Sequence, residues 1–117
     1  MSALQISLET PSDDRVVILL GGELDLATAP ELQESLRSVE SNDALGLVVL
    51  DLRKLQFIDS SGLRVVIGAD SRARKSGRRL VLVRGGEAVH RVFRLTLLDQ
   101  RLEFVDDPRE IRESSRE

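Results

Sequence analysis

The chain has 117 residues, the size of one ordinary domain with a single core. Hydrophobic residues make up 41% of it and aromatic residues only 3%, with no Trp or Tyr, which predicts an aliphatic core and argues against an RNA-binding surface of stacked aromatics. A net charge of -3 without a long basic run argues against a nucleic-acid binder, and the lack of cysteine excludes disulfides, thiolate zinc sites and cysteine nucleophiles.

Three local patterns bear on where the protein works. The apolar runs VVILL and LGLVVL have the length of strands, far short of the ~20 residues of a membrane span. The N-terminal MSALQISLE lacks the basic-then-apolar pattern of a signal peptide. One cluster of cations is interpreted as a solvated helix end, where positive charge opposes the macrodipole: Arg72, Arg74, Lys75, Arg78 and Arg79. We therefore expect a soluble cytoplasmic protein.

The first two elements are expected to be strands. LQISLE (residues 4–9) alternates apolar and polar residues, and RVVILLGGEL (15–24) is a continuous apolar run. The intervening PSDD (11–14) has the residue types that form turns. Two strands joined by such a turn predict an antiparallel pair.

A helix and a buried strand are expected next. TAPELQESLRSV (28–39) has apolar positions at spacings of four and three, the period of one helical face: Leu32, Leu36 and Val39. Thr28 stands three residues before Glu31, the spacing of a capping box. GLVVLDL (46–52) is apolar enough for a strand that is buried on both faces.

Two further helix–strand units complete the pattern. A second helix begins in DSSG (59–62) and ends near Gly77, a residue that suits a C-terminal cap. RLVLV (79–83) is a strand, after which Gly85 and Gly86 lead into a third helix. LEFV predicts a last short strand. The charged residues 106–117 are expected to form a terminal helix or tail that frays.

Strands that alternate with helices predict an α/β fold. We expect one domain over residues 1–117, with its core from about 4 to 105. Its sheet should be mixed but mostly parallel, with an N-terminal antiparallel strand pair and about four helices. The period and the strand positions predict these buried residues: Leu32, Leu36, Val48, Leu50, Leu63, Ile67, Leu82, Val92 and Phe93.

FIDSSGL places two adjacent serines at the carboxyl end of a predicted strand, where sites tend to form in open α/β sheets. Asp and Ser are also the preferred N-caps of helices. Asp59 is expected to accept a hydrogen bond from the backbone N–H of Ser61 or Gly62, and Gly62 is expected to be small because helix and sheet approach each other there. Local chemistry alone favours this capping role. It leaves one serine that has no part in capping and is expected to be exposed.

A serine hydrolase is rejected as an explanation of the serines. The nucleophile elbow of such enzymes reads G-x-S-x-G, and Ile58 stands where the first glycine is needed. The only histidine, His90, lies beside the apolar positions of the third helix and is expected on the helix surface. We therefore reject a serine hydrolase.

A receiver domain that is phosphorylated on aspartate is also rejected. Asp51 ends the VVLDL run, but Asp13 and Asp14 precede a strand instead of following one, and no lysine follows the last strand. Asp51 is interpreted as a strand-end residue that binds loop amides. Gly85 and Gly86 are interpreted as a tight turn rather than a phosphate cradle. No nucleotide motif and no metal-ligand spacing is present, so neither a cofactor nor a metal is expected.

Three stretches together resemble the STAS domain, and most closely the bacterial anti-sigma factor antagonists: GELDLATAPEL, VVLDLRKLQFIDSSGL and RLVLVRGGEAVHRVFRLTLLD. The resemblance runs in order and spacing from about Leu4 to Val105. FIDSSGL, at its distance after GELD and an apolar strand, is the most specific element. One position departs from the family, since Leu97 stands where its members usually have glycine, in the turn after the third helix.

The resemblance implies a partner-switching mechanism. The unphosphorylated antagonist binds an anti-sigma factor that is also a GHKL-type serine kinase, and thereby frees a sigma factor. Phosphorylation in DSSG ends the binding, and a PP2C-type phosphatase restores it. The resemblance thus implies a substrate and ligand with no catalytic residue and no enzymatic activity of its own. The acceptor of the family corresponds to Ser61, with Ser60 as a minor site, and Asp25 matches a position used in kinase recognition. The implied partner-binding residues are Asp25, Asp59, Ser60, Ser61 and Gly62.

A scaffold is the alternative function. Some STAS domains are fixed subunits that bind the ATPase of lipid transporters or build stress-sensing assemblies. The serine pair favours the switch, because a scaffold needs no acceptor hydroxyl. We expect a monomer with neither a nucleic-acid nor a membrane partner. Asp25, between strand and helix, is expected to remain solvated and to contribute little to stability.

Overall fold

Five strands form one sheet in the order β1-β2-β3-β4-β5 in the computed structural model, which describes residues 2–111. The strands are β1 (Leu4–Ser12), β2 (Arg15–Leu24), β3 (Leu47–Ile58), β4 (Arg79–Val83) and β5 (Glu103–Val105). β1 pairs antiparallel with β2, and the pairs β2–β3, β3–β4 and β4–β5 are parallel. The predicted mixed sheet with its N-terminal antiparallel pair is confirmed.

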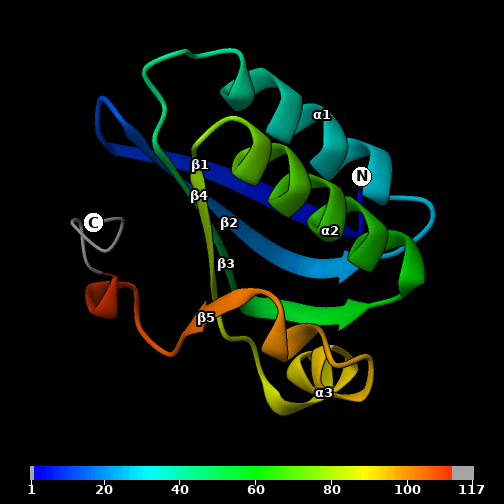
Figure 1. Ribbon diagram of the computed structural model, residues 1–117. Coiled ribbons are helices and arrows are strands. Elements are labelled where there is room, and N and C mark those ends of the chain that lie inside the picture. The colour runs from blue at the N-terminus through cyan, green and yellow to red at the C-terminus, as the bar shows by residue number, and fades with distance from the viewer. Residues whose placement is uncertain (1, 112–117) are drawn as a thin grey trace.

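Three α-helices and two short 3-10 helices connect or follow the strands. They are α1 (Ala29–Glu40), α2 (Ser60–Lys75), α3 (Glu87–Leu95), η1 (Leu98–Gln100) and η2 (Pro108–Glu110). α1 and α2 lie side by side over one face of the sheet, and α3 lies next to the end of β3 (Figure 1). The expected terminal helix is only the 3-10 helix η2, and the rest of that expectation, residues 112–117, lies outside the described residues.

The main core lies between the sheet and the helices. From β2 it contains the alternating residues Val16, Ile18 and Leu20 and the last residue, Leu24, and Phe93 of α3 is fully buried in it. Seven of the nine residues predicted to be buried are so: Leu32, Leu36, Val48, Leu50, Leu63, Leu82 and Phe93. Ile67 and Val92 are half-buried and pack against the same core. The aliphatic composition therefore fills one continuous core, as predicted.

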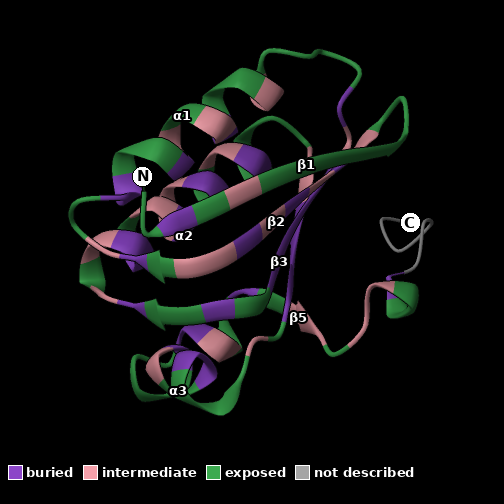
Figure 2. Ribbon diagram, turned by 180° about the vertical axis from the view of Figure 1, so that it is seen from behind, coloured by how far each residue is buried: buried purple, intermediate pink, exposed green. Residues whose placement is uncertain are grey.

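A smaller apolar cluster lies on the rear face of the sheet. Side chains alternate between the two faces of a strand, so Leu47 and Val49 point away from the main core that contains Val48 and Leu50. The cluster consists of Leu47, Val49, Val81, Val83 and Ile111. Because Ile111 is buried in it, the domain extends beyond the expected core limit near residue 105. Figure 2, seen from behind, shows that β1 at the open edge of the sheet is mostly exposed.

β3 is longer than predicted, since it continues beyond Leu52 to Ile58. Its pairing with β2 shifts register twice, between Leu19 and Gly21 and between Gly22 and Glu23, and such bulges let a strand bend. Asp51 therefore lies inside the strand, where it is buried. Its carboxylate accepts hydrogen bonds from Arg53 Nε at 3.0 Å and Nη2 at 2.7 Å. The carboxylate also accepts from the backbone N–H of Arg53 at 3.0 Å, so Asp51 does bind a backbone amide as expected, but that amide belongs to the strand and Asp51 is not at a strand end.

The cation cluster at the end of α2 holds elements together. Arg72 pairs with Glu40 of α1 at 2.9 Å. Arg74 pairs with Asp70 one turn earlier in α2 at 2.8 Å and donates to the backbone carbonyl of Arg101 at 3.0 Å. Arg78 donates to the backbone carbonyls of Leu45, Glu40 and Asn42, and Arg79 pairs with Glu103 of β5. These arginines thus act as ties between chain segments, which the interpretation as a solvated helix end had not foreseen.

His90 is buried, and the expectation of a surface histidine was wrong. Its ring lies 4.9 Å from that of Phe104 in an edge-to-face contact and 6.4 Å from that of Phe93. Among the described residues, its Nδ1 is buried without a hydrogen-bond partner. Burial, and next the nearby charge of Arg84, lower the pKa of His90. His90 is buried together with Val89 and Phe93 of the same helix. Both His90 and Phe93 contact Phe104 of β5, so the histidine faces inward.

Candidate functional site

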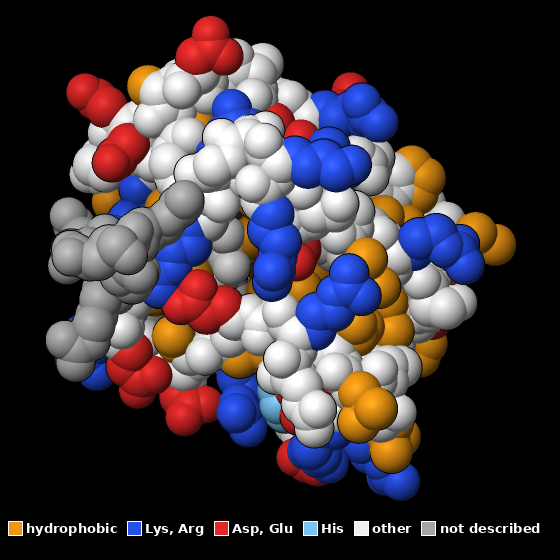
Figure 3. All heavy atoms as spheres, viewed as in Figure 1, with side chains coloured by type: hydrophobic (Ala, Val, Ile, Leu, Met, Phe, Trp, Pro, Cys, Tyr) orange, Lys and Arg blue, Asp and Glu red, His pale blue; other side chains and the backbone are white. Residues whose placement is uncertain are grey.

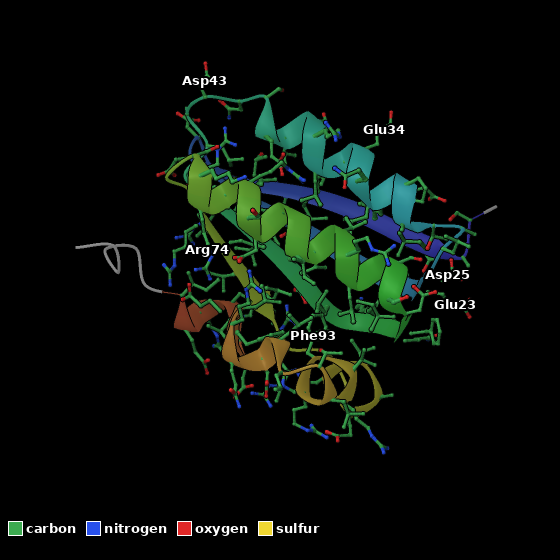
Figure 4. The ribbon with its side chains drawn as sticks, turned by 45° about the vertical axis from the view of Figure 1, so that its right-hand side comes forward. Glu23, Asp25, Glu34, Asp43, Arg74 and Phe93 are labelled. Atoms are coloured by element: carbon green, nitrogen blue, oxygen red, sulfur yellow. The ribbon has the colours of Figure 1, made fainter. Side chains whose placement is uncertain are left out.

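The predicted site residues meet where β2 and β3 end side by side. Leu24 and Ile58, the last residues of the two strands, are register partners, and the backbone N–H of Asp59 donates to the carbonyl of Leu24 at 3.2 Å. The loops that follow the two strands therefore start next to each other. Figure 4 shows Asp25 beside the first turn of α2, whereas Arg74 lies at the other end of that helix.

Asp59 caps α2, as predicted. Its Oδ1 accepts from the backbone N–H of Ser61 at 2.9 Å and from that of Gly62 at 3.2 Å. The backbone of Asp59 is extended, which is the usual conformation of an N-cap residue. Two of the amides that a helix start leaves unpaired are satisfied in this way. The positions of both serines are thus fixed by an acceptor outside the helix.

Asp25 caps the loop that leads to α1, whereas the N-cap residue of that helix is Thr28, and its sequence position did not suggest this role. Its Oδ1 accepts from the backbone N–H of Ala27 at 3.0 Å and from that of Thr28 at 3.1 Å. The predicted capping box is absent: the Thr28 side chain makes no cap hydrogen bond to α1 and instead donates to the carbonyl of Glu23 at 2.9 Å. The carboxylate of Asp25 is half-buried rather than freely solvated.

Both serine hydroxyls are available. Ser60 is exposed and Ser61 half-buried, at the first two positions of α2. Within residues 2–111 neither hydroxyl makes a hydrogen bond to the protein, since Ser61 takes part only through its backbone N–H. A nucleophilic serine needs a base within hydrogen-bond reach, and neither serine has one in this conformation. The arrangement suits a hydroxyl that another enzyme modifies.

Gly62 is buried where α2 comes closest to the sheet, as predicted. A β-carbon at this position would lie 2.7 Å from Leu24 Cγ and 2.9 Å from Ile58 Cγ1. These distances are too short for any side chain, so glycine lets the start of α2 sit directly on the two strand ends. Gly62 therefore sets the position of the serines and has no side chain with which to contact a partner.

Two exposed apolar side chains border the serines, and sequence reasoning did not single them out. Leu26, next to Asp25, is 76% exposed, and Phe57, two residues before Asp59, is 48% exposed. Leu26 lies in the loop after β2, and Phe57 lies in the part of β3 that the sequence pattern did not assign to the strand. Exposed apolar residues next to polar ones are typical of a protein-binding surface.

The described residues offer no metal site. No group of three His, Asp or Glu side chains in residues 2–111 is placed to hold a metal ion. An open hollow of about 1040 Å³ lies on the rear of β1, β2 and β3, and its lining includes Gln5, Glu23, Asp51 and Lys54. The serine pair does not line it. The candidate site is the strand-end surface with Asp25, Asp59, Ser60 and Ser61.

Comparison with known families decides what kind of domain carries this surface. The family model described as the STAS domain matches residues 5–113. The chain belongs to the STAS domain family. This confirms the resemblance that GELD, FIDSSGL and the alternating strands and helices had indicated.

Three relatives illustrate the position of the chain within the STAS family. It is 30% identical to an anti-sigma-B factor antagonist of Listeria monocytogenes over 101 residues, 86% of this chain and 88% of the relative. An anti-sigma factor antagonist from Mycobacterium paratuberculosis has the same fold with a TM-score of 0.73 at 26% identity, covering 91% of this chain and 88% of that one. The Bacillus cell fate determinant SpoIIAA, solved in its phosphorylated form, matches with a TM-score of 0.71 at 23% identity, covering 90% and 95%.

Among the residues that the structure describes, none forms a helix with the length and apolar character that a membrane crossing requires.

Proposed function

We propose that this STAS domain is an anti-sigma factor antagonist that works by partner switching. In its unphosphorylated form it binds an anti-sigma factor that is also a GHKL-type serine kinase, and the sigma factor held by that kinase is released. Phosphorylation of Ser61 ends the binding, and a PP2C-type phosphatase reverses it. The protein then acts as a ligand and a substrate, without catalysis of its own, in the cytoplasm. The names of its relatives support the first step.

One observation carries the proposal: within residues 2–111 the hydroxyl of Ser61 makes no hydrogen bond to the protein, although the residue stands at a capped helix start beside a second ordered loop. Asp59 holds the backbone of Ser61, so the hydroxyl is presented in a fixed place without being used by the fold. Asp25 holds the neighbouring loop in the same way. A kinase that recognises a folded surface needs such fixed geometry around the acceptor.

The chemistry of phosphorylation at this place explains a switch. A phosphate adds about -1.5 to -2 charges at pH 7, and the macrodipole at a helix N-terminus favours a negative charge. The carboxylate of Asp59 already accepts the hydrogen bonds of the Ser61 and Gly62 amides. The helix start therefore stabilises the phosphate less than an uncapped helix start would. The fold should tolerate the modification with little change in melting temperature.

Binding should not tolerate the phosphate. The new charge would stand beside the carboxylates of Asp59 and Asp25, in the middle of the proposed contact surface. Like charges and lost close contact across an interface cost several kcal/mol, and each ~1.4 kcal/mol is tenfold in affinity. The same modification that leaves the domain folded therefore separates it from its partner.

The decisive experiment compares the two serines. The purified protein is incubated with its cognate anti-sigma factor kinase and ATP, and the phosphate is located by mass spectrometry. We expect one phosphate, which Ser61→Ala removes and Ser60→Ala leaves. The matched pair is informative because Ser60 is the more exposed of the two, so that simple access would give the opposite result. Phosphate on Ser60 alone, or on neither, would contradict the proposed site.

A binding measurement completes the test. Ser61→Asp should bind the kinase at least tenfold more weakly than the wild type, whereas Ser61→Ala should bind about as well. Equal affinity of the aspartate variant and the wild type would contradict the switch. A kinase-independent role as a scaffold, in a lipid-transporter or stress-sensing complex, would then be the function to test.

A further inference from the structure

The chain leaves two leucines exposed at the end of α3, of which Leu95 is the last helical residue. Leu95 is 72% exposed and Leu97 is 63% exposed. Residues 95–97 form the Leu95–Leu97 ridge. Single exposed leucines are common on protein surfaces and need no explanation. Here two of them stand one residue apart, and the conformation of the second is unusual.

Leu97 adopts a left-handed conformation, with φ 62° and ψ 15°, the only positive φ of a non-glycine residue among the described residues. The β-carbon makes this conformation unfavourable for every residue type except glycine and, less so, asparagine or aspartate. Because its side chain is exposed, Leu97 gains little from burial in return. Strain without compensation in the fold is the kind of observation from which a function is inferred.

Local hydrogen bonds hold the ridge in this shape. The backbone N–H of Leu97 donates to the carbonyl of Arg94 at 3.0 Å, and its carbonyl accepts from Gln100 at 3.3 Å. The hydroxyl of Thr96, between the two leucines, donates to the carbonyl of Val92 at 2.8 Å. The ridge is therefore presented rigidly, which lowers the entropy lost on binding.

Positive charge flanks the ridge although the chain as a whole carries a net charge of -3. Arg91, one helical turn before Leu95, and Arg101 are both exposed, and neither forms a salt bridge within residues 2–111. Arg94 in contrast pairs with Glu87 at 2.8 Å. Figure 3 shows hydrophobic side chains gathered over the region of α2 and α3, with Lys and Arg side chains around them.

We propose that the Leu95–Leu97 ridge is a second docking site for the anti-sigma factor, which would receive it in an apolar groove rimmed by carboxylates. This inference rests on the proposed function. The unpaired arginines supply the charge complementarity, and the leucines supply the apolar contact. Figures 1 and 4 both place α3 beside the end of β3, from which the chain continues into Asp59 and Ser61, so one partner can cover both surfaces.

The inference is tested by titration calorimetry with the purified anti-sigma factor, together with thermal melts. Leu95→Ser and Leu97→Gly should each raise Kd at least tenfold, while the melting temperature of Leu97→Gly stays equal or rises. Leu8→Ser is the matched control, because Leu8 is 51% exposed on β1, at the opposite edge of the sheet from β5, and it should leave Kd unchanged. A fall in melting temperature together with affinity for Leu97→Gly would show a structural role and overturn the inference.

The remaining outcomes separate the inference from the proposed function. If the wild type does not bind the anti-sigma factor, both are overturned. If the wild type binds, and the ridge variants bind with the same Kd, only the docking site is overturned. Light scattering of the free protein adds one case. A dimer that dissociates in Leu95→Ser, with unchanged partner binding, would assign the ridge to a second copy of the chain instead.

The role of the positive charge is tested by the double variant Arg91→Glu with Arg101→Glu, which should weaken binding of the anti-sigma factor. Arg37→Glu on α1 is the control and should not weaken it.

Discussion

Asp25 and Asp59 stand directly after Leu24 and Ile58, the register partners that end β2 and β3, and each carboxylate accepts two backbone N–H groups of the residues two and three positions ahead. The two loops are thus built in the same way on neighbouring strands. An aspartate at each strand end turns the chain toward the helix that follows. The carboxylates fix the surface that carries the serines before any partner arrives.

The first prediction concerns these two caps. Asp25→Ala and Asp59→Ala should each lower the free energy of unfolding by about 0.5–2 kcal/mol, the usual loss when an aspartate cap is removed. Urea denaturation measures it. Glu23→Ala is the control, because Glu23 is an exposed neighbour whose carboxylate has no hydrogen-bond partner among the described residues. Unchanged stability of Asp25→Ala would support the solvated role that the sequence suggested.

A second prediction separates the charge of Asp25 from its capping. Asparagine keeps an oxygen that accepts hydrogen bonds, so Asp25→Asn should retain most of the stability that alanine loses. If the kinase reads the negative charge, Asp25→Asn should still be phosphorylated more slowly than the wild type. A variant with normal phosphorylation and normal stability would show that Asp25 serves the loop alone.

The third prediction uses two glycines of α2. Gly62→Ala should destabilise the protein by about 1–3 kcal/mol, because the new methyl group would meet Leu24 and Ile58 at under 3.0 Å in a packed region. Gly68→Ala is the matched control, since its β-carbon would meet only the end of the Arg72 side chain, at 3.3 Å. Alanine favours a helix, so that this variant should gain about 0.5–1 kcal/mol. Equal effects at both positions would contradict the close packing at the serine site.

The sequence pattern predicted those features that depend on local periodicity. The spacing of Leu32 and Leu36 located a helix and its buried face, and the continuous apolar run of β3 located a central strand. Asp59 was recognised as a cap because it directly precedes a helical pattern. These inferences succeeded since a single element decides each of them.

The features that the pattern missed depend on contacts between distant segments. His90 looks like a surface residue in its helix, yet Phe104 of β5 covers it. Asp51 looks like the end of a strand, but the pairing of β3 with β2 continues to Ile58. The capping role of Asp25 depends on how the loop folds back over residues 27 and 28. None of these contacts leaves a periodic signal in the sequence.

The fourth prediction concerns the left-handed residue Leu97. Leu97→Gly should raise the free energy of unfolding by about 0.5–1 kcal/mol, since relief of about 1–2 kcal/mol of backbone strain exceeds the ~0.4–1 kcal/mol that glycine costs through the unfolded chain. Leu97→Ala keeps the β-carbon and should bring no such gain. A stabilisation of equal size in both variants would show that removal of the exposed leucine, rather than backbone strain, is responsible.

The last prediction concerns the pH dependence that His90 gives to stability. Burial, then Arg84 and Arg94, lower the pKa of His90 in the folded protein, while Asp99 and Glu87 oppose them more weakly. In the unfolded chain the pKa of histidine is about 6.5. Below that pH the unfolded chain binds more protons than the folded one, so stability should fall as the pH decreases.

The contribution of His90 is therefore complete above about pH 6.5 and is lost as the pH falls through the lower pKa of the folded state. Because His90 is the only histidine, its ring protons give a single NMR titration, which should have a midpoint below the unfolded value. Urea denaturation should show stability falling from pH 7 to 5.5, above the range in which most carboxylates titrate. His90→Leu should remove most of this slope, whatever its stability at pH 7. A slope that persists in His90→Leu, or a midpoint above 6.5, would contradict the buried neutral ring between Phe93 and Phe104.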